Sequence, residues 1–397
     1  MLSHDVAGAL APRLAERLRA RGPLLRDFFA REAPRLALAA RELADRFERG
    51  GRLYAFGNGP YATDAAHVSV EFVHPVIVGK RALPALDVSA APDPFLDALV
   101  TPDDMALGFG PPEGDLRIDG TLRRARRKGA FTLAWPGSEA DYAVSAPAVD
   151  AHVHQEAFEV LGHTLYESVH VFLEHGRELG EDVGASAFLY PYLGSAQADP
   201  GAILADVAAS VLAKVRDGER LRAQVADEEA GAIAAAVEAM RARLAAGGRL
   251  LIFGNGGSAT DATDFALDCV DAAPGMRALP AISLAAEPAV LSAIANDVGN
   301  ELTFVRQIIA QARPADVAFA LSTSGGSKNV AAALGEARAR GLLTVALLGY
   351  DGGEIVRRGL ADHPIVVRCD SIPRIQETQA AIYHVVRQAL AEDHHGT

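Results

Sequence analysis

The sequence predicts an α/β fold of two tandem domains, each a mainly parallel sheet flanked by helices. The first observation is an internal repeat: GNGGSATD at residues 254–261 has a near copy, GNGPYATD, at residues 57–64. Each copy follows an apolar run and precedes an alanine-rich segment, which is typical of a strand, a tight turn and a helix start. The second is the alternation of strand-like and helix-like segments in both halves, which indicates parallel sheets covered on both faces. The length of 397 residues also exceeds one domain of roughly 150 residues.

The repeat sets the predicted boundaries, with a first domain over residues 1–180, a linker over 181–202 and a second domain over 203–397. Each domain begins with leucines, valines and isoleucines spaced for amphipathic helices, and we expect the first stretch to break near Gly22 and Pro23. These helices carry more apolar surface than one domain needs. We therefore expect them to pack between the halves and between chains of an oligomer.

The predicted strands follow the apolar runs of both halves. In the first half they cover residues 53–56, 82–88, 105–109 and 130–135, with helices through residue 72 and from about residue 155. In the second half they cover residues 250–253, 278–284, 317–321, 343–348 and 365–368, with helices through residue 270 and from about residue 376. Ligands gather at the carboxyl ends of such strands, so we expect the site there.

Composition limits the possible partners. The formal net charge of −13 argues against a general affinity for nucleic acid or anionic membranes, while it leaves room for a local basic pocket. Two cysteines are too few for a disulfide scaffold, and we find neither a secretion signal pattern nor an apolar run of roughly 18 residues. We therefore expect a cytoplasmic protein with no nucleic-acid or membrane partner.

The segment after the strand at 317–321 is rich in hydroxyl groups. It reads STSGGSKN over residues 322–329, and a helix is expected to follow. Hydroxyls and free N–H groups at a helix start form an uncharged cradle for a phosphate dianion. A serine-rich helix cap without a ligand is the plainer interpretation of this segment alone. The glycine turn at 254–261 offers a second seat for an anion in the same half, which favours the phosphate site.

The first half differs at this place. The two copies are offset by 197 residues at Gly57 and Gly254 and by 212 at Pro102 and Pro314, so the first copy lacks 15 residues in between. Opposite the serines it reads GPPEGD over residues 110–115, where two prolines remove N–H donors and two carboxylates repel phosphate. We therefore predict that the first copy has lost its phosphate loop.

The first half instead offers metal-ligating and acid–base residues. His67 and Glu71 are four residues apart on a predicted helix and can bind a divalent ion, and Gln155 and His163 follow later. Eight helical residues span about 12 Å, so either Gln155 precedes its helix or one ligand comes from a neighbouring half. His170, farther along, is expected on the surface.

Together these features resemble the sugar isomerase (SIS) family, and within it the phosphoheptose isomerases. Those enzymes convert sedoheptulose 7-phosphate into D-glycero-D-manno-heptose 7-phosphate. The likeness covers nearly the whole chain as two consecutive copies. In the second copy the motifs GNGGSATDA, LPAISL, AIANDVGN, RPADV, LSTSGGSKNV and RIQE lie in the family's order.

The resemblance implies roles for single residues. The substrate phosphate would be held by Ser258, Ser322, Thr323, Ser324 and Ser327, with Asp297 near the sugar, and we add Asn255 and Gln376 to the predicted substrate-binding set. A zinc site would be built from His67, Glu71, Gln155 and His163. Glu71 and His163 match the family's acid–base pair, and no organic cofactor is expected.

Each copy also departs from the family pattern. In the second copy Asp264 and Asp268 replace the metal-binding His and Glu, while Gln376 and His384 remain. The first copy lacks the serines. We therefore expect a division of labour, in which the first copy supplies metal and acid–base groups, the second supplies phosphate loops, and the site is composite. The family's members are homotetramers, so a homodimer of this chain is expected to imitate four single domains.

The predicted reaction is an aldose–ketose isomerisation through an enediolate. Glu71 would move the carbon-bound proton, and His163 or His384 the oxygen-bound one. The alternative is a non-catalytic sugar-phosphate-binding or regulatory protein, because decay toward that role would leave the same losses. Another transformation of a phosphorylated sugar is the third possibility.

Overall fold

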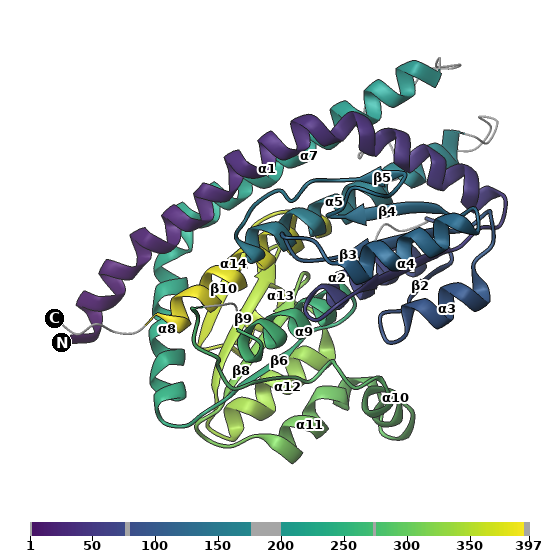
Figure 1. Cartoon of the computed structure of the whole chain (residues 1–397). Helices are drawn as coiled ribbons and strands as arrows, with labels where there is room; N and C mark the ends of the chain where they lie inside the picture. The colour runs from purple at the N-terminus through teal and green to yellow at the C-terminus, as the bar shows by residue number, and fades with distance from the viewer. Residues whose placement is uncertain (1, 76–79, 176–199, 273–274, 393–397) are drawn as a thin grey trace. The chain divides into compact units, whose positions relative to one another are not determined.

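The computed structural model describes residues 2–75, 80–175, 200–272 and 275–392. It contains two five-stranded sheets whose paired strands all run parallel, with helices on both faces, so the predicted fold class is confirmed (Figure 1). Of the predicted linker, residues 181–199 lie outside the described part of the chain.

The first copy forms a sheet with the strand order β2-β1-β3-β4-β5. Its strands are β1 (Leu53–Gly57), β2 (Ala85–Asp87), β3 (Met105–Phe109), β4 (Phe131–Trp135) and β5 (Tyr142–Ala143). Its helices are α2 (Tyr61–Val73), α3 (Pro92–Leu99), α4 (Leu116–Arg127) and α5 (Ala151–His175), and two long helices, α1 (Leu2–Glu48) and α7 (Pro200–Glu228), contribute to both copies. The strand expected over 82–88 is shorter, and β5 and α3 were not predicted.

Alternation along β1 explains why this sheet is buried on both faces. Leu53 and Ala55 belong to a core that includes residues of α1, α2, α5 and α7, while Tyr54 and Phe56 belong to a core that includes residues of α3 and α4. The sheet is therefore the middle layer of three.

The second copy forms a sheet with the order β10-β9-β8-β6-β7. Its strands are β6 (Leu250–Phe253), β7 (Ala281–Ser283), β8 (Val317–Ser322), β9 (Leu343–Gly349) and β10 (His363–Val367). Its helical segments are α8 (Ala230–Ala245), α9 (Gly257–Val270), α10 (Pro288–Asp297), η1 (Asn300–Leu302), α11 (Thr303–Gln311), α12 (Lys328–Ala339), α13 (Gly353–Arg357) and α14 (Ile372–Ala391). Between α10 and β8 this copy has η1 and α11, whereas α3 leads to β3 directly. Leu96 of α3 shares a core with residues of α4, as Ile308 of α11 does with residues of α12, whereas no residue of α10 is buried. The 15 residues missing from the first copy therefore correspond to α10 and η1.

The chain divides into two compact units, one of residues 1–22 with 218–397 and the other of residues 23–217. Leu14 and Leu18 of α1 belong to the core of the second copy, and Leu25 and Phe28 of the same helix belong to the core of the first. This division differs from the predicted boundaries near residues 180 and 203. The reason is that α1 and α7 each contribute residues to the cores of both copies.

The expected break near Gly22 and Pro23 is wrong, since α1 is one continuous helix over 47 residues. Gly22 instead allows close packing. A Cβ atom at Gly22 would lie 2.7 Å from Cγ of Glu219 on α7, so any larger residue there would force the Glu219 side chain to move.

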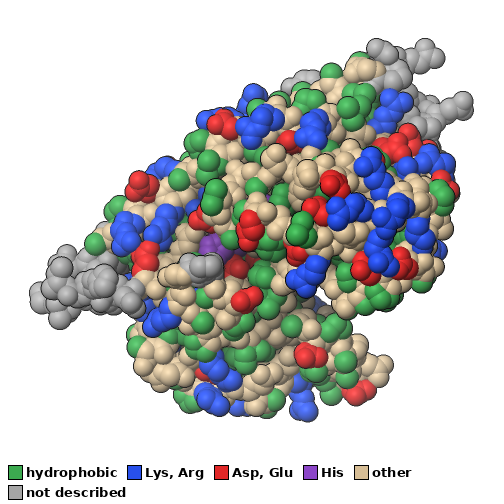
Figure 2. All heavy atoms as spheres, viewed as in Figure 1, with side chains coloured by type: hydrophobic (Ala, Val, Ile, Leu, Met, Phe, Trp, Pro, Cys, Tyr) green, Lys and Arg blue, Asp and Glu red, His purple; other side chains and the backbone are tan. Residues whose placement is uncertain are grey.

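No helix in the described ranges is long and apolar enough to cross a membrane. Figure 2 shows charged side chains of both signs over the visible face, and Lys and Arg gather where Figure 1 places α4.

Candidate functional site

Both sheets place their glycine turns where the strand order reverses. β1 lies between β2 and β3, and β6 lies between β7 and β8. In parallel sheets a crevice forms at such a point, at the carboxyl ends of the strands, and ligands bind there. The turns after β6 and β8, at residues 254–258 and 322–327, both end at this point of the second sheet.

Three of the predicted metal ligands form a buried group in the first copy. His67 and Glu71 lie on one face of α2 and His163 lies on α5, with exposed fractions of 7%, 3% and 1%. Nε2 of His67 is 3.2 Å from Nε2 of His163, and one potential ligand atom from each residue lies within 4.8 Å of the others. Oε2 of Glu71 forms no hydrogen bond with the described residues.

This geometry fits a divalent metal. Two imidazole nitrogens at roughly 2.0–2.1 Å from a tetrahedral zinc ion are about 3.3 Å apart, close to the 3.2 Å found here. Two imidazoles and a carboxylate are also a set that zinc accepts, with a fourth position open to water or substrate. The residues therefore fit the predicted metal, and its identity stays a prediction.

Gln155 faces α2 one turn away from this group. Because α5 begins at Ala151, the alternative that Gln155 precedes the helix is wrong. Its Nε2 donates a hydrogen bond of 3.4 Å to Oγ1 of Thr63, four residues before His67 on α2. The role of Gln155 as a fourth ligand stays a prediction.

His170 is buried rather than exposed, so the surface expectation is wrong. Its exposed fraction is 3%, because the neighbouring Val171 packs on residues of α1 and α7 that cover this side of α5. Burial lowers the pKa of His170 to about 4. Its ring lies 4.8 Å from that of Tyr166, whose pKa is raised by burial and by the charge of Glu71.

In the first copy the loop after β3, residues 110–115, is held by hydrogen bonds to other groups of the same copy. Asp115 accepts hydrogen bonds from Nδ2 of Asn58 at 2.6 Å and from the backbone N–H of Arg117 at 2.8 Å. Partial burial opposes ionisation, but these hydrogen bonds lower the pKa of Asp115. The copy therefore holds a carboxylate at the position that matches Ser327.

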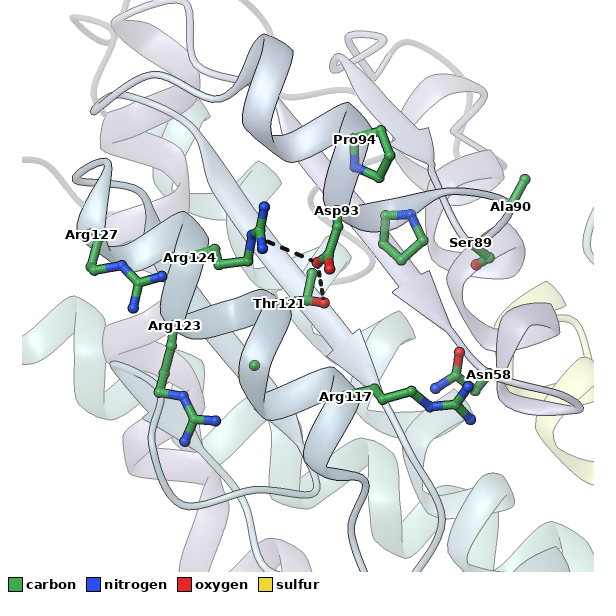
Figure 3. Close-up of a pocket in the computed structure, with 12 residues that line it drawn as sticks. Asn58, Ser89, Ala90, Asp93, Pro94, Arg117, Thr121, Arg123, Arg124 and Arg127 are labelled. Carbon is green, nitrogen blue, oxygen red and sulfur yellow. Dashed lines mark hydrogen bonds and ion pairs between the residues drawn. The ribbon is translucent and has the colours of Figure 1, made fainter.

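Beside this loop a pocket of about 640 Å³ lies between α3 and α4 (Figure 3). Asn58, Ser89 and the start of α3 line one side, and α4 contributes Arg117, Arg123, Arg124 and Arg127. Sequence reasoning missed this pocket, because its residues come from three segments. The run RRARRK at residues 123–128 is the one sequence signal from which this basic pocket could have been predicted.

In the second copy the serine loop is ordered by its own hydrogen bonds. Oγ of Ser322 accepts from the backbone N–H of Gly325 at 3.1 Å and lies 3.3 Å from Oγ of Ser327. Gly325 has a φ of +60°, and a Cβ atom there would lie 2.3 Å from the carbonyl oxygen of Gly352, so the turn requires glycine. α12 begins directly after the loop and adds the N–H groups of its first turn. The loop thus has the geometry of a phosphate cradle, although its ligand stays a prediction.

The other predicted substrate-binding residues occupy different positions. Ser258 is buried in the first turn of α9, and Asn255 exchanges hydrogen bonds of 2.9 and 2.8 Å with Asn329. Nε2 of Gln376 donates to Oδ2 of Asp261 at 2.9 Å. Asp297 is exposed at the end of α10, and within the described ranges no hydrogen bond or ion pair links it to the serine loop.

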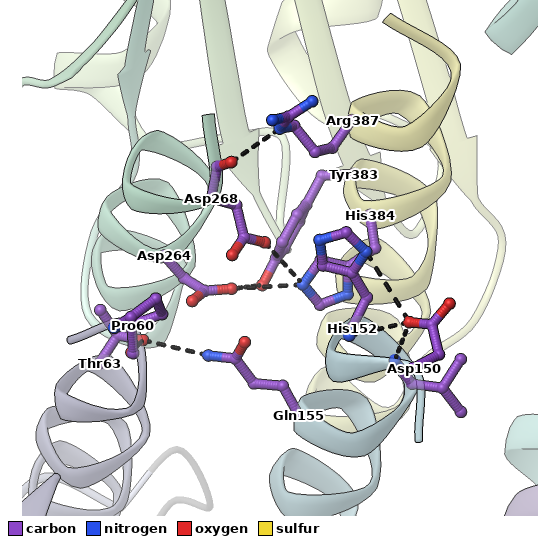
Figure 4. Close-up of polar contacts among 11 residues, drawn as sticks. Pro60, Thr63, Asp150, His152, Gln155, Asp264, Asp268, Tyr383, His384 and Arg387 are labelled. Carbon is purple, nitrogen blue, oxygen red and sulfur yellow. Dashed lines mark hydrogen bonds and ion pairs between the residues drawn. The ribbon is translucent and has the colours of Figure 1, made fainter. Parts of the chain in front are cut away.

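Figure 4 shows a second buried group, on α9 and α14. Asp264 and Asp268 each place an Oδ2 atom 3.4 Å from Nε2 of His384. The hydroxyl of Tyr383 donates to Asp264 at 2.8 Å, and Nε of Arg387 donates to the carbonyl oxygen of Asp268 at 2.8 Å. The second copy therefore keeps a compact group at the positions of His67, Glu71 and His163, with a second carboxylate in place of one imidazole.

The structure thus brings the predicted residues together in two groups, one in each compact unit. His67, Glu71 and His163, with Gln155 nearby, lie in the unit of residues 23–217. The serine loop and His384 lie in the other unit. Sequence reasoning missed Tyr383 and Arg387, since only the fold shows that they contact the aspartates.

Comparisons with known proteins agree with this architecture. The family model described as the SIS domain matches residues 215–349. The phosphoheptose isomerase of Geotalea daltonii is 42% identical over 181 residues, which cover 45% of this chain and 93% of that protein. The chain belongs to the SIS-domain family that includes the phosphoheptose isomerases. The phosphoheptose isomerase of Geobacter sulfurreducens is likewise 42% identical over 177 residues, covering 44% of this chain and 93% of its own.

Several solved structures match over at least 95% of this SIS-domain chain. One of them is the C-terminal domain of glucosamine-fructose-6-phosphate aminotransferase from Francisella tularensis, with a TM-score of 0.59, 11% identity and 95% of both chains covered. At this identity the likeness shows the fold alone.

Proposed function

We propose that this protein is a phosphosugar isomerase of the phosphoheptose isomerase type. The expected reaction is the interconversion of sedoheptulose 7-phosphate and D-glycero-D-manno-heptose 7-phosphate. Relatives with that name, which the chain matches over 93% of their length, support the substrate class. The observation that carries the proposal is the buried group of His67, Glu71 and His163, since it combines a candidate base with a candidate metal site.

The chemistry needs a base for a carbon-bound proton and a group that moves a proton between two oxygens. Glu71 is suited to the first task, because one of its oxygens forms no hydrogen bond with the described residues. His163 or His384 is suited to the second, since an imidazole can both accept and donate a proton near neutral pH. Serine hydroxyls and N–H groups at the start of α12 would hold the phosphate and fix the sugar in place.

A divalent metal on His67, Glu71 and His163 would supply a Lewis acid that polarises the carbonyl and stabilises negative charge on oxygen. The expected ion is zinc, with about one bound per chain. Metal analysis of the purified protein tests this expectation. A His67→Ala variant should lose the metal, whereas a His384→Ala variant should retain it.

We further propose that a complete site combines the first copy's acid–base group with the second copy's serine loop, within an oligomer such as a homodimer. Neither copy holds both sets, because residues 110–115 carry acidic groups and prolines where residues 322–327 carry hydroxyls. Mixing inactive Glu71→Gln chains with inactive Ser322→Ala/Ser327→Ala chains and exchanging subunits would test the idea. Turnover by the mixed variants would support a site built from residues of two subunits. If the mixture stays inactive, the site is built from groups of one chain.

The reaction itself is best tested by proton NMR on a panel of ketose and aldose phosphates from pentose to heptose. The wild type should convert at least the seven-carbon substrate. Glu71→Gln should lower turnover by a factor of about 1,000 and still bind the sugar phosphate in calorimetry, while Glu113→Gln, an exposed matched control, should behave as the wild type. Full turnover by Glu71→Gln would refute the proposed base.

A second candidate is a non-catalytic sugar-phosphate-binding or regulatory protein. Replacement of the metal-site His and Glu by Asp264 and Asp268, together with the closed loop in the first copy, favours it. This candidate predicts a metal-free protein that converts no member of the panel and still binds sugar phosphate at residues 322–327.

A further inference from the structure

The second copy brings two aspartates and one histidine together in its interior. Asp264 and Asp268 lie four residues apart on α9, and His384 lies on α14, with exposed fractions of 3%, 8% and 1%. One potential ligand atom from each residue lies within 4.8 Å of the others. Figure 4 shows both carboxylates turned toward the imidazole ring. The group therefore belongs to a single compact unit, that of residues 1–22 and 218–397.

The distances in this group fit a metal site better than a hydrogen bond. Nε2 of His384 is 3.4 Å from Oδ2 of Asp264 and 3.4 Å from Oδ2 of Asp268. A protonated imidazole donates to a carboxylate over about 2.7–2.9 Å, and its single Nε2–H points at only one acceptor. Two ligand atoms of a tetrahedral divalent ion, at bond lengths of roughly 2.0–2.2 Å, are instead about 3.3–3.6 Å apart. Two equal distances of 3.4 Å therefore fit an ion that all three side chains share.

The local charge also favours a bound cation. Two carboxylates buried this close together repel each other, and a buried charge is costly without an opposite charge beside it. Arg387 lies nearly one turn beyond His384, but its Nε donates to the carbonyl oxygen of Asp268 at 2.8 Å and its Nη2 to that of Arg277 at 2.9 Å. Both bonds are to the backbone rather than to the carboxylates. A divalent cation next to a neutral imidazole balances the two aspartates.

Tyr383 holds one of the carboxylates in place for such an ion. Its hydroxyl, on α14, donates a hydrogen bond of 2.8 Å to Oδ2 of Asp264. A carboxylate oxygen that accepts one hydrogen bond keeps a second lone pair for a cation. Outer hydrogen bonds of this kind orient the ligands of metal ions. The ligand geometry of Asp264 is therefore fixed before an ion binds.

The donor set differs from that of the first copy. Asp264 stands at the position of His67, while Asp268 and His384 match Glu71 and His163. One imidazole is thus replaced by a carboxylate. Imidazole suits zinc, whereas carboxylate oxygens suit harder ions such as Mn²⁺ and Mg²⁺. The two groups therefore differ in the ion that each prefers.

We propose that Asp264, Asp268 and His384 form a second divalent-cation site, for an ion harder than zinc, such as Mn²⁺. The ion ties α9 to α14 inside the second copy. This site is independent of the isomerase activity, because it is built from side chains of the second copy alone.

Titration of the metal-stripped full-length chain with Mn²⁺ tests the proposal, since electron paramagnetic resonance counts the unbound ion. A His67→Ala/His163→Ala variant lacks the first copy's group and should still bind one Mn²⁺ per chain. The wild type that carries one equivalent of zinc should bind the same amount, so the result does not depend on the folding of the variant. No Mn²⁺ binding in either protein would overturn the proposal.

The nitrogen ligands of the bound ion give a second measurement. Electron spin-echo spectra of Mn²⁺ in the zinc-loaded wild type should show one imidazole nitrogen, that of His384. Adding His384→Gln should remove this signal. Signals from two imidazole nitrogens would place the ion at His67 and His163, and a signal that survives His384→Gln would place it elsewhere, and either result would overturn the proposal.

The carboxylate ligands are tested by Asp264→Asn/Asp268→Asn, which keeps the size of both side chains. Mn²⁺ binding should weaken roughly tenfold or more, because two charged oxygen ligands become neutral amides. The matched control, Asp351→Asn/Glu354→Gln, removes the same charge from exposed positions of the same unit and should change the affinity less than about twofold. Melting temperatures check the folding of both variants. Equal weakening in the two would show a general charge effect, and unchanged binding in Asp264→Asn/Asp268→Asn would exclude the aspartates as ligands; each outcome overturns the proposal.

Discussion

The two copies share a strand order and a switch point, yet each keeps a different part of one chemical site. The first copy has His67, Glu71 and His163 in a group of buried ligands, and its loop after β3 is closed by Asp115. The second copy has an ordered serine loop, and two aspartates surround its histidine. The difference teaches that a parallel α/β scaffold tolerates exchange of its loop residues and loss of a whole helix, because neither change touches the layers that form the core.

The largest expected effect comes from equivalent carboxylates in the two copies. Glu71→Gln should lower kcat by a factor of about 1,000, within the range for removal of a general base, while Asp268→Asn should lower it less than tenfold. Steady-state turnover of the heptose phosphate, followed by NMR, measures both. Melting temperatures serve as the control for folding. An equal loss in Asp268→Asn would place the chemistry in the second copy as well and remove the contrast.

Much of the fold followed from local pattern. Apolar runs predicted β1, β3, β6 and β8 to within one residue at each end, since both faces of these strands are buried. Gly22 and Pro23 predicted a helix break that does not occur. The helix stays continuous because Leu18 and Leu25, on either side of them, are both buried in hydrophobic cores. Short segments such as α3 and β5 were missed, since two to eight residues carry too little periodicity.

The candidate site was predictable where its residues lie close in sequence. The serine loop and the pair of His67 and Glu71 are local patterns on one turn or one helix. The group around His384 was not predictable in the same way, because Asp264 and Asp268 reach it across more than a hundred residues. Sequence alone therefore indicated a lost metal site there, whereas the structure shows the side chains still gathered.

The next expected effect is on stability at acid pH, and it differs between the copies because His170 in the first copy matches Ala391 in the second. Burial lowers the pKa of His170 from 6.5 to about 4, so between these values the unfolded chain binds a proton that the folded chain does not. Stability therefore falls as the pH decreases through this window, by about 2 kcal/mol at pH 5 relative to pH 7.5. His170→Phe should remove that part of the loss, and His74→Gln, at an exposed position, should not. Urea titrations at both pH values measure it, and parallel losses in wild type and His170→Phe would contradict it.

The smallest expected effect compares one new carboxylate in the two loops. Ser324 and Pro112 are matched positions at the offset of 212. Ser324→Asp should raise the KM for a sugar phosphate about tenfold, because a second negative charge near a phosphate costs on the order of 1 kcal/mol or more at a solvated site. Pro112→Asp adds the same charge beside Glu113 and Asp115, where we expect no phosphate, so its KM should change less than twofold. If Pro112→Asp weakened binding as much as Ser324→Asp, the first loop would still hold phosphate, and the two copies would differ in strength of binding rather than in kind.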